Sequence, residues 1–239
     1  MIAKGGLIAG AIGVLAGGSA VALWAGTGGG GSRAEVEGIV RDYLLENPEI
    51  LAEASVKLQE REAGKLVEAN RAAIETPFAG GWAGAENGDV VLVEFFDYAC
   101  GYCRKSNEDV DRLLKEDPKL KVVWREWPVL GPDSEAAAKV SLAAAREGKY
   151  RPFFNALFAA GRPTAAAVAQ AQRAAGVSPQ AVAAVQAGAA QELAKNHEIA
   201  SGLRATGTPT FVVGDQVLQG AVGYEALKEA IAEARKGGA

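Results

Sequence analysis

The two cysteines of this chain, Cys100 and Cys103, stand where a β-strand pattern gives way to a helix pattern. The run 90–98 is rich in β-branched and aromatic residues, which is typical of a buried strand. A break at 99–101 follows, and a polar, charged run then predicts a helix that continues to about Lys115. Residues i and i+3 share one face of a helix, so the two sulfur atoms can close a disulfide without movement of the backbone.

This placement predicts different roles for the two sulfur atoms. Cys100 would lie at the helix N-terminus, where unpaired backbone N–H groups and the helix dipole stabilise an anion. We therefore expect Cys100 to be the attacking thiolate and Cys103, one turn further in and more covered, to be the resolving thiol. The motif favours a redox-active dithiol.

Two other interpretations of the cysteine pair are weaker. A structural zinc site usually needs four nitrogen or sulfur ligands, and the chain offers two cysteines and one distant histidine, His197. A purely structural disulfide across so short a loop would remove little entropy from the unfolded chain. We predict no metal site and no organic cofactor. His197 lies in a helical pattern, and we expect a solvated residue without a catalytic role.

Length and charge bound the class of protein. The 239 residues are enough for one large domain or two small ones. The formal net charge is −4 and there is no basic stripe, so nucleic acid is not an expected partner. A single pair of cysteines with no surplus thiols fits an oxidising compartment.

Residues 1–31 are predicted to lie outside the globular fold. Lys4 gives a short positive start, an uncharged stretch continues to Gly31, and Ala20-Val21-Ala22 is similar to an A-x-A cleavage site. The uncharged run is also long enough for a membrane anchor, although its many glycines weaken that interpretation. We favour an export signal followed by a flexible linker, and either interpretation places the bulk of the chain outside the cytoplasm.

Residues 32–75 are predicted to form a helical extension. Apolar residues recur at helical spacing from Val36 to Leu44, and Asn47-Pro48 indicates the start of a second helix. Two interpretations of the apolar positions stay open: the segment packs back on its own domain, or it pairs with copies of itself. The heptad pattern is too short and too interrupted to establish a coiled coil.

The remaining chain predicts strands around a helical insertion. The run 120–127 is a second strand, and the order strand, helix, strand favours a right-handed parallel βαβ unit. From Glu135 to about Ala205 there is almost no strand pattern, and breaks containing glycine or proline divide this part into four or five helices. A strand from Gly207, a turn at Gly214-Asp215 and a short returning strand predict a hairpin before the last helix.

This order of elements resembles that of the DsbA-like thiol–disulfide oxidoreductases. The resemblance rests on Glu94-Phe95-Phe96-Asp97-Tyr98 before the cysteines and on Gly207-Thr208-Pro209-Thr210-Phe211 after the helical insertion. It covers roughly residues 76–236 and implies an α/β, thioredoxin-like fold with an inserted helical domain. Residues 33–75 resemble the N-terminal extension of the ScsC-like and Com1-like branch, some members of which trimerise through it and act as disulfide isomerases.

The sequence patterns and the resemblance together divide the chain into five segments. These are 1–31 as leader or anchor plus linker, 32–75 as helical extension, 76–132 as the first part of the thioredoxin fold, 133–205 as the inserted helical domain, and 206–239 as the second part of the thioredoxin fold.

The resemblance also implies roles for single residues. Cys100 matches the nucleophile, and Cys103 matches the thiol that forms a disulfide with it. Pro209 matches the cis-proline beside that disulfide, which would turn the backbone of Thr208 toward a bound peptide. Glu94 matches a partly buried acid that could relay the proton of Cys103.

The chain departs from the strongly oxidising members of the family between the cysteines. Those members have Pro-His there, whereas this chain has Gly101-Tyr102. Neither residue carries positive charge, so we expect the Cys100 thiolate to depend on the helix end and on Arg104 or Lys105 nearby. This predicts a less stabilised thiolate and a weaker oxidant. Tyr102, with Gly101 and Thr208, would contact unfolded substrates.

We therefore predict an exported thiol–disulfide oxidoreductase, and favour a disulfide isomerase over a dedicated oxidase. The expected partners are unfolded or misoxidised proteins, a redox partner protein, and copies of the chain itself in a homo-oligomer, such as a trimer, formed through residues 33–75. One alternative is a DsbA-type oxidase that works as a monomer. Another is a metal-tolerance protein that holds Cu(I) between Cys100 and Cys103.

Overall fold

A computed structural model describes residues 32–237 of the protein. By its contacts the chain divides into two units, one up to Val56 and one from Lys57 onward, so the predicted extension 32–75 has residues in both. The export signal or anchor predicted for residues 1–31 lies outside the described residues. Within 32–237, no helix is both long enough and apolar enough to cross a membrane.

The first unit contains α2 (Arg33–Glu46) and the beginning of α3 (Glu49–Glu75). A capping box starts α2: Ser32 Oγ accepts the N–H of Glu35, and the carboxylate of Glu35 accepts the N–H of Ser32. No residue of α2 is buried. Its apolar stripe, which we define as Val36, Ile39, Val40 and Tyr43, is 50 to 70% exposed.

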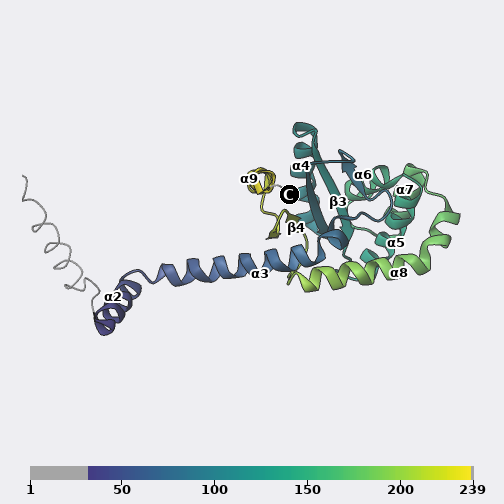
Figure 1. The fold of residues 1–239 in the computed structure, drawn as a ribbon. Helices are drawn as coiled ribbons and strands as arrows, with labels where there is room; N and C mark the ends of the chain where they lie inside the picture. Colours follow the sequence, from purple (N-terminus) through teal and green to yellow (C-terminus); the bar gives the residue numbers. More distant parts are fainter. Residues whose placement is uncertain (1–31, 238–239) are drawn as a thin grey trace, which may run out of the picture. The chain divides into compact units, whose positions relative to one another are not determined.

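The second unit is built on a mixed sheet (Figure 1). The strand order in this sheet is β1-β3-β2-β4-β5. The strands are β1 (Trp82–Gly84), β2 (Val90–Phe96), β3 (Leu120–Glu126), β4 (Thr210–Val213) and β5 (Gln216–Gln219). β2 and β3 are parallel and are joined by α4 (Gly101–Glu116), as the predicted βαβ unit requires. β4 and β5 form the predicted hairpin, and β4 pairs antiparallel with β2.

β1 is a strand that the sequence does not predict. The sequence indicates only a glycine-rich connector before β2, whereas Trp82–Gly84 pairs antiparallel with β3 at the edge of the sheet. Gly84 has a φ of +91°, and a Cβ at this position would collide with the carbonyl oxygen of Leu120. Glycine is therefore required where this short strand approaches its neighbour so closely.

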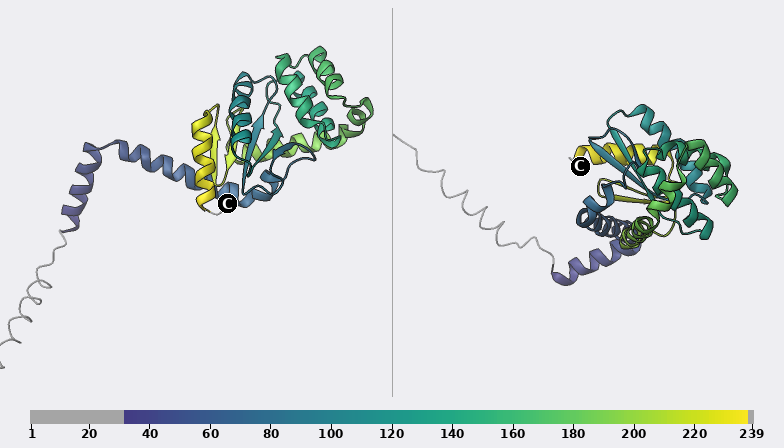
Figure 2. Two further views of the ribbon diagram at one scale, coloured as in Figure 1. Left: turned by 90° about the horizontal axis from the view of Figure 1, so that it is seen from above. Right: turned by 90° about the vertical axis from the view of Figure 1, so that its right-hand side faces the viewer.

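Helices cover both faces of the sheet. Alternate residues of β2, such as Leu92 and Phe96, pack on one face with α4, with α9 (Tyr224–Gly237) and with helices of the insertion. The intervening residues, Val93 and Phe95, pack on the other face with the end of α3 and the end of α8. In the left view of Figure 2 the insertion, in green, lies toward one edge of the sheet and α9, in yellow, toward the opposite edge.

Four helices form the insertion, in the segment where the sequence predicts four or five. They are α5 (Pro132–Arg146), α6 (Tyr150–Ala160), α7 (Ala165–Ala175) and α8 (Pro179–Gly202). The hydroxyls of Thr164 and Ser178 cap α7 and α8. The fold is thus the α/β, thioredoxin-like arrangement with inserted helices that the sequence predicts.

Arg125 connects the two helices that lie on the second face of the sheet. Its side chain is 2% exposed. The guanidinium donates to three backbone carbonyls at the end of α3, and to the side chains of Glu192 and Asn196 on α8. The last carbonyls of a helix have no partner within the helix, so this side chain satisfies groups that would otherwise be buried without hydrogen bonds.

We predict that Arg125→Leu lowers the free energy of unfolding by about 3–5 kcal/mol, because it leaves buried carbonyls and the charge of Glu192 without their partner. Urea unfolding followed by circular dichroism measures this loss. As a control, Arg173→Leu on the exposed side of α7 should change the free energy of unfolding by less than about 0.5 kcal/mol. Equal effects of the two substitutions would contradict this role of Arg125.

Candidate active site

Asp97 fixes the turn between β2 and α4. Its carboxylate is 1% exposed and accepts three backbone N–H groups, those of Ala99 at 2.7 Å, Val129 at 2.8 Å and Leu130 at 2.9 Å. Its own carbonyl accepts the N–H of Cys100 at 3.0 Å. The turn before the cysteines and the loop after β3 are therefore held together by one side chain. We assigned Asp97 no role from the sequence, although an aspartate just before a turn is a known turn pattern.

Cys100 is the N-cap residue of α4, as the sequence predicts. Its Sγ accepts the backbone N–H of Cys103 at 3.4 Å. Both cysteines are free thiols. Cys100 is 6% exposed and Cys103 is fully covered, so only the first sulfur can be reached from solvent.

The pKa values of the two thiols are shifted in opposite directions. Hydrogen bonding to the Cys103 thiol is the largest cause that lowers the pKa of Cys100, to about 5. A hydrogen bond with the side chain of Thr208 and the backbone N–H groups of Cys103 and Tyr102 act in the same direction, against the effect of burial. Burial raises the pKa of Cys103, and the hydrogen bond to Cys100 and the charge of Glu94 raise it further. Cys100 is thus the thiolate at neutral pH, and Cys103 keeps its proton.

Arg104 does not stabilise this thiolate in the way that we expected. Its guanidinium donates to the carbonyls of Phe158 and Gly161, which end α6, at 3.1 and 2.6 Å. Hydrogen-bond donors at the helix start, rather than the side chain of Arg104, lower the pKa of Cys100.

The segment Thr208-Pro209 lies against the reactive sulfur. When Cys100 is protonated, its thiol donates to the carbonyl oxygen of Thr208 at 3.2 Å. The peptide bond between Thr208 and Pro209 is cis. Pairing of β4 with β2 brings these residues to the dithiol from more than a hundred positions along the chain.

Exposed apolar residues occur on the two segments that Asp97 joins, the start of α4 and the loop after β3. Tyr102 is 69% exposed, and an added Cβ on Gly101 would meet no atom within 4 Å. Val129 and Leu130, on the loop that Asp97 holds, are 43 and 55% exposed. The segments on either side of Cys100 therefore present exposed apolar side chains.

Glu94 is a buried carboxyl in the middle of β2. It is not exposed at all, and Oε2 accepts the indole N–H of Trp124 on β3 at 3.0 Å. Oε1 has no hydrogen-bond partner among residues 32–237. Burial raises the pKa of Glu94 to about 8, although the hydrogen bond from Trp124 lowers it. Sequence reasoning did not find Trp124, which meets Glu94 because the two residues pair across parallel strands.

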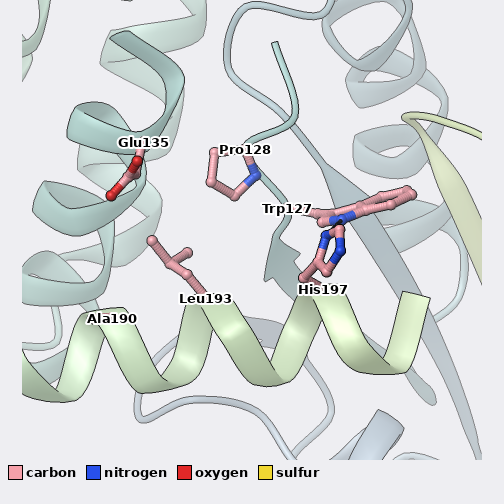
Figure 3. A pocket seen from close by; sticks show the side chains of 6 residues that line it. All are labelled: Trp127, Pro128, Glu135, Ala190, Leu193 and His197. Atoms are coloured by element: carbon pink, nitrogen blue, oxygen red, sulfur yellow. Dashed lines mark hydrogen bonds between the residues drawn. The ribbon is translucent and has the colours of Figure 1, made fainter. Parts of the chain in front are cut away.

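His197 lies away from the site around the two cysteines. It is exposed on α8, and its Nδ1 accepts the indole N–H of Trp127 at 3.2 Å (Figure 3). The two residues line a cavity of about 230 Å³ to which neither cysteine contributes. In the part of the chain that the structure describes, no three His, Cys, Asp or Glu side chains are grouped so that they could hold a metal ion.

We predict that Glu94→Gln stabilises the reduced protein at neutral pH while it keeps an oxygen acceptor for Trp124. The raised pKa of Glu94 means that the folded state holds a proton that the unfolded state releases. Its contribution to stability is therefore complete below about pH 4.5 and is lost as the pH rises toward about 8.

The expected gain in the free energy of unfolding is on the order of 3 kcal/mol at pH 7 and close to zero near pH 4. Urea unfolding of both proteins with reductant, at a series of pH values, measures it. A difference that does not depend on pH would show that Glu94 does not titrate as its burial predicts.

Comparison with known proteins places this geometry in a family. A family model described as DSBA-like thioredoxin domain matches residues 91–232, and one described as copper resistance protein ScsC N-terminal domain matches residues 33–64. Among curated proteins, the Na(+)/H(+) antiporter NhaA 3 of Salinispora tropica is 31% identical over 78 residues. That match covers 32% of this chain, and the chain spans only 12% of the length of the antiporter.

Several solved structures share the fold. A thioredoxin-like oxidoreductase from Silicibacter pomeroyi has 36% identity and a TM-score of 0.66, over 70% of this chain and 98% of its own. A periplasmic thioredoxin-like protein from Salmonella enterica serovar Typhimurium has 25% identity and a TM-score of 0.63, over 70 and 95%. A linker-deleted mutant of ScsC from Proteus mirabilis has 25% identity and a TM-score of 0.67, over 88 and 99%.

These matches confirm the resemblance that the sequence motifs indicated. The thioredoxin-domain match covers more than half of the chain and includes the dithiol, the inserted helices and the Thr-Pro segment. The chain therefore belongs to the family of DSBA-like thioredoxin domains, and it is a thioredoxin-like oxidoreductase of the ScsC and DsbA type.

Proposed function

We propose that this protein is a disulfide isomerase that rearranges the disulfides of exported proteins. The observation that carries the proposal is the pair of unequal thiols at the start of α4. Cys100 is an accessible N-cap sulfur with a pKa of about 5, and Cys103 is covered and holds its proton. The thiolate of such a pair can attack a substrate disulfide at neutral pH. The mixed disulfide then persists until the second thiol loses its proton and reacts.

The exchange proceeds through a mixed disulfide at Cys100. The Cys100 thiolate attacks one sulfur of a substrate disulfide, forms a new S–S bond, and releases the other substrate sulfur as a thiolate. In isomerisation a substrate thiolate then attacks the mixed disulfide, makes a different substrate disulfide and returns Cys100 as thiolate. The numbers of disulfides and thiols are unchanged by this cycle, so it needs no oxidant.

The second thiol, Cys103, can release a substrate that stays bound in the mixed disulfide. Cys103 attacks Cys100, the Cys100–Cys103 disulfide forms, and the substrate leaves with its cysteine as a thiolate. Cys103 must lose its proton for this step, and Glu94 is the buried carboxyl whose charge raises the pKa of Cys103. We assign Glu94 the role of proton acceptor. A redox partner protein then supplies two electrons to restore the dithiol.

The pKa of Cys100 supports isomerisation over dedicated oxidation. A stabilised thiolate favours the reduced form and makes the disulfide more oxidising. The nucleophilic cysteine has a pKa of about 3.5 in DsbA and about 7 in thioredoxin, and Cys100, at about 5, lies between them. An intermediate potential leaves a useful fraction of the protein reduced, which is the form that starts isomerisation.

Substrates are proposed to bind in an extended conformation along Thr208 and Pro209. The peptide groups beside Cys100 can pair with a substrate backbone, as in strand addition. Tyr102, Val129 and Leu130 offer exposed apolar contacts at the same place. Such contacts suit unfolded proteins, whose apolar side chains are accessible, and require no defined sequence.

We also propose that the apolar stripe of α2 joins copies of the chain. No residue of α2 is buried, although its stripe has the spacing of a packing face. The match of residues 33–64 to the ScsC N-terminal model supports a specialised role for this segment. A periplasmic relative supports an extracytoplasmic location, with residues 1–31 acting as an export signal or anchor.

Alkylation tests the activated thiol. We expect Cys100 of the reduced protein to react with iodoacetamide with a midpoint near pH 5, and Cys103 to stay unmodified while the protein is folded. Mass spectrometry of the peptides quantifies both. In urea the two thiols should react alike, with midpoints near about pH 8.5. A folded protein whose Cys100 stays inert up to pH 8 would rule out the proposed function.

Charge substitutions in the stripe test the link between assembly and isomerisation. We expect wild-type protein to form oligomers by light scattering, and Ile39→Glu with Tyr43→Glu to dissociate them. The double variant should refold scrambled ribonuclease at least about tenfold more slowly, because two sites no longer act on one substrate.

Insulin reduction, which needs only one dithiol, should be unchanged in the same double variant. Arg41→Glu, at an exposed polar position of α2, serves as the matched control and should retain both activities. A wild-type protein that is a monomer, or a dissociated variant that isomerises normally, would contradict the proposed role of the stripe.

A further inference from the structure

Five buried side-chain atoms lack hydrogen-bond partners in the described part of the second unit, and two of them belong to an acid and a base. One is Oε1 of Glu94 on β2, and the other is Nη1 of Arg151 on α6. A buried polar atom without a partner is costly, so each such atom in a folded protein needs a reason. Arg151 belongs to the inserted helical domain, to which neither the sequence motifs nor the thiol chemistry assign a function.

The indole of Trp124 lies between these two groups. The guanidinium carbon of Arg151 is 4.5 Å from the centre of the Trp124 ring, and the indole N–H of Trp124 donates to Oε2 of Glu94 at 3.0 Å. A cation over an aromatic face is a favourable arrangement. The positive charge of Arg151 is thus held on one side of a ring whose edge binds the carboxyl.

Asp111 on α4 holds Arg151 in this position. Its Oδ1 accepts from Nη2 of Arg151 at 2.6 Å, and the two side chains are only partly exposed. The pair leaves Nη1 free, so the guanidinium is anchored at one end and unpaired at the other.

We propose that Arg151 is a positioning residue for the dithiol, because its charge, held over Trp124 by Asp111, sets how strongly Glu94 binds the proton that Cys103 must give up. The inference rests on the proposed role of Glu94 as proton acceptor. It places a determinant of thiol chemistry in the helical insertion.

Several titratable or charged groups face Glu94 from the elements packed around it. From α4 and its N-cap they are Cys100, Cys103 and Asp111, and from α6 they are Tyr150 and Arg151. Arg151 is the cation in this set. Its charge lowers the pKa of Glu94, whereas the charges of Cys100 and Asp111 raise it.

The consequence concerns the step in which Cys103 attacks the mixed disulfide. The proton of the Cys103 thiol passes to the Glu94 carboxylate, the Cys103 sulfur bonds to Cys100, and the substrate sulfur leaves with the electron pair of the broken S–S bond. Glu94 accepts the proton only when it is ionised. A cation nearby increases the ionised fraction at neutral pH, and so makes the step faster.

A purely structural role for Arg151 makes a different prediction. If Arg151 only ties α6 to α4, removal of either partner of the Arg151–Asp111 pair should disturb Glu94 in the same direction. If its charge acts on Glu94, loss of Arg151 and loss of Asp111 should have opposite effects. The sign of the two effects therefore separates the two roles.

The protonation of Glu94 can be read directly from the infrared carbonyl band of its protonated carboxyl, in the full-length reduced protein. Loss of the band in Glu94→Gln assigns it. We expect a titration midpoint near pH 8 in the wild type. Arg151→Met should raise this midpoint by about one pH unit, Asp111→Asn should lower it, and Arg151→Lys should stay close to the wild type.

Arg112→Met is the matched control. Arg112 also lies over an aromatic ring, 3.7 Å from the centre of Tyr224, and pairs with Glu116 at 2.8 Å, but it is absent from the charges that face Glu94. Its removal should leave the midpoint unchanged. If Arg151→Met does not fold, Asp111→Asn alone decides the question, because a midpoint that is unchanged or raised overturns the inference.

A single-turnover measurement connects this midpoint to the reaction. The mixed disulfide of Cys100 with glutathione is prepared at low pH, and release of glutathione is followed after a jump to higher pH. We expect the pH dependence of release to shift in the same two directions as the infrared midpoint. Release that is identical in wild type, Arg151→Met and Asp111→Asn would overturn the role of Arg151.

Failure of the proposed function would look different. A wild-type mixed disulfide that releases no glutathione at any pH would refute the resolving role of Cys103, and with it the role that we assign to Arg151 in that step. The infrared midpoints would still show whether Arg151 and Asp111 act on Glu94. The two proposals therefore fail on separate measurements.

Discussion

The thiol chemistry that we propose depends on one sulfur atom, which occupies the N-cap position of α4. At this position Cys100 Sγ receives the hydrogen bonds that a capping oxygen would receive, and its negative charge is stabilised by the helix end. The sulfur stays at the N-cap only if the turn before Cys100 is held in one conformation. Asp97 ensures this, because its carboxylate binds three backbone N–H groups of the turn and of the loop after β3.

The helical insertion is connected to the dithiol helix at two points. Arg104 of α4 donates to the carbonyls that end α6, and Arg151 of α6 donates to Asp111 of α4. Charged side chains therefore join α4 to the insertion at two positions, Arg104 and Asp111, which lie two turns apart on the same side of the helix. The second contact also holds the guanidinium of Arg151 over the ring of Trp124, which donates to Glu94.

The two interpretations of the N-terminal extension apply to different parts of it. Val67 and Ile74 of α3 are fully buried against the second face of the sheet, and Arg125 donates to the carbonyls of Ala73, Ile74 and Thr76. The second half of α3 therefore packs on its own domain. The apolar stripe of α2 is exposed, and the proposal of self-association rests on that stripe. A periodic apolar pattern looks the same in both cases, because it shows only that a face is apolar and not what covers it.

The sequence by itself determined the features that depend on neighbours along the chain. These are the strand and helix around Cys100 and Cys103, the helical insertion with its caps at Thr164 and Ser178, and the hairpin led by Pro209. Only the tertiary structure decided the short strand β1, the true partner of Arg104, and the placement of Trp124 and Arg151 beside Glu94. The physical reason is that these contacts join residues far apart in the chain. Many residues have the same chemical character, and only strand register and helix packing decide which of them meet.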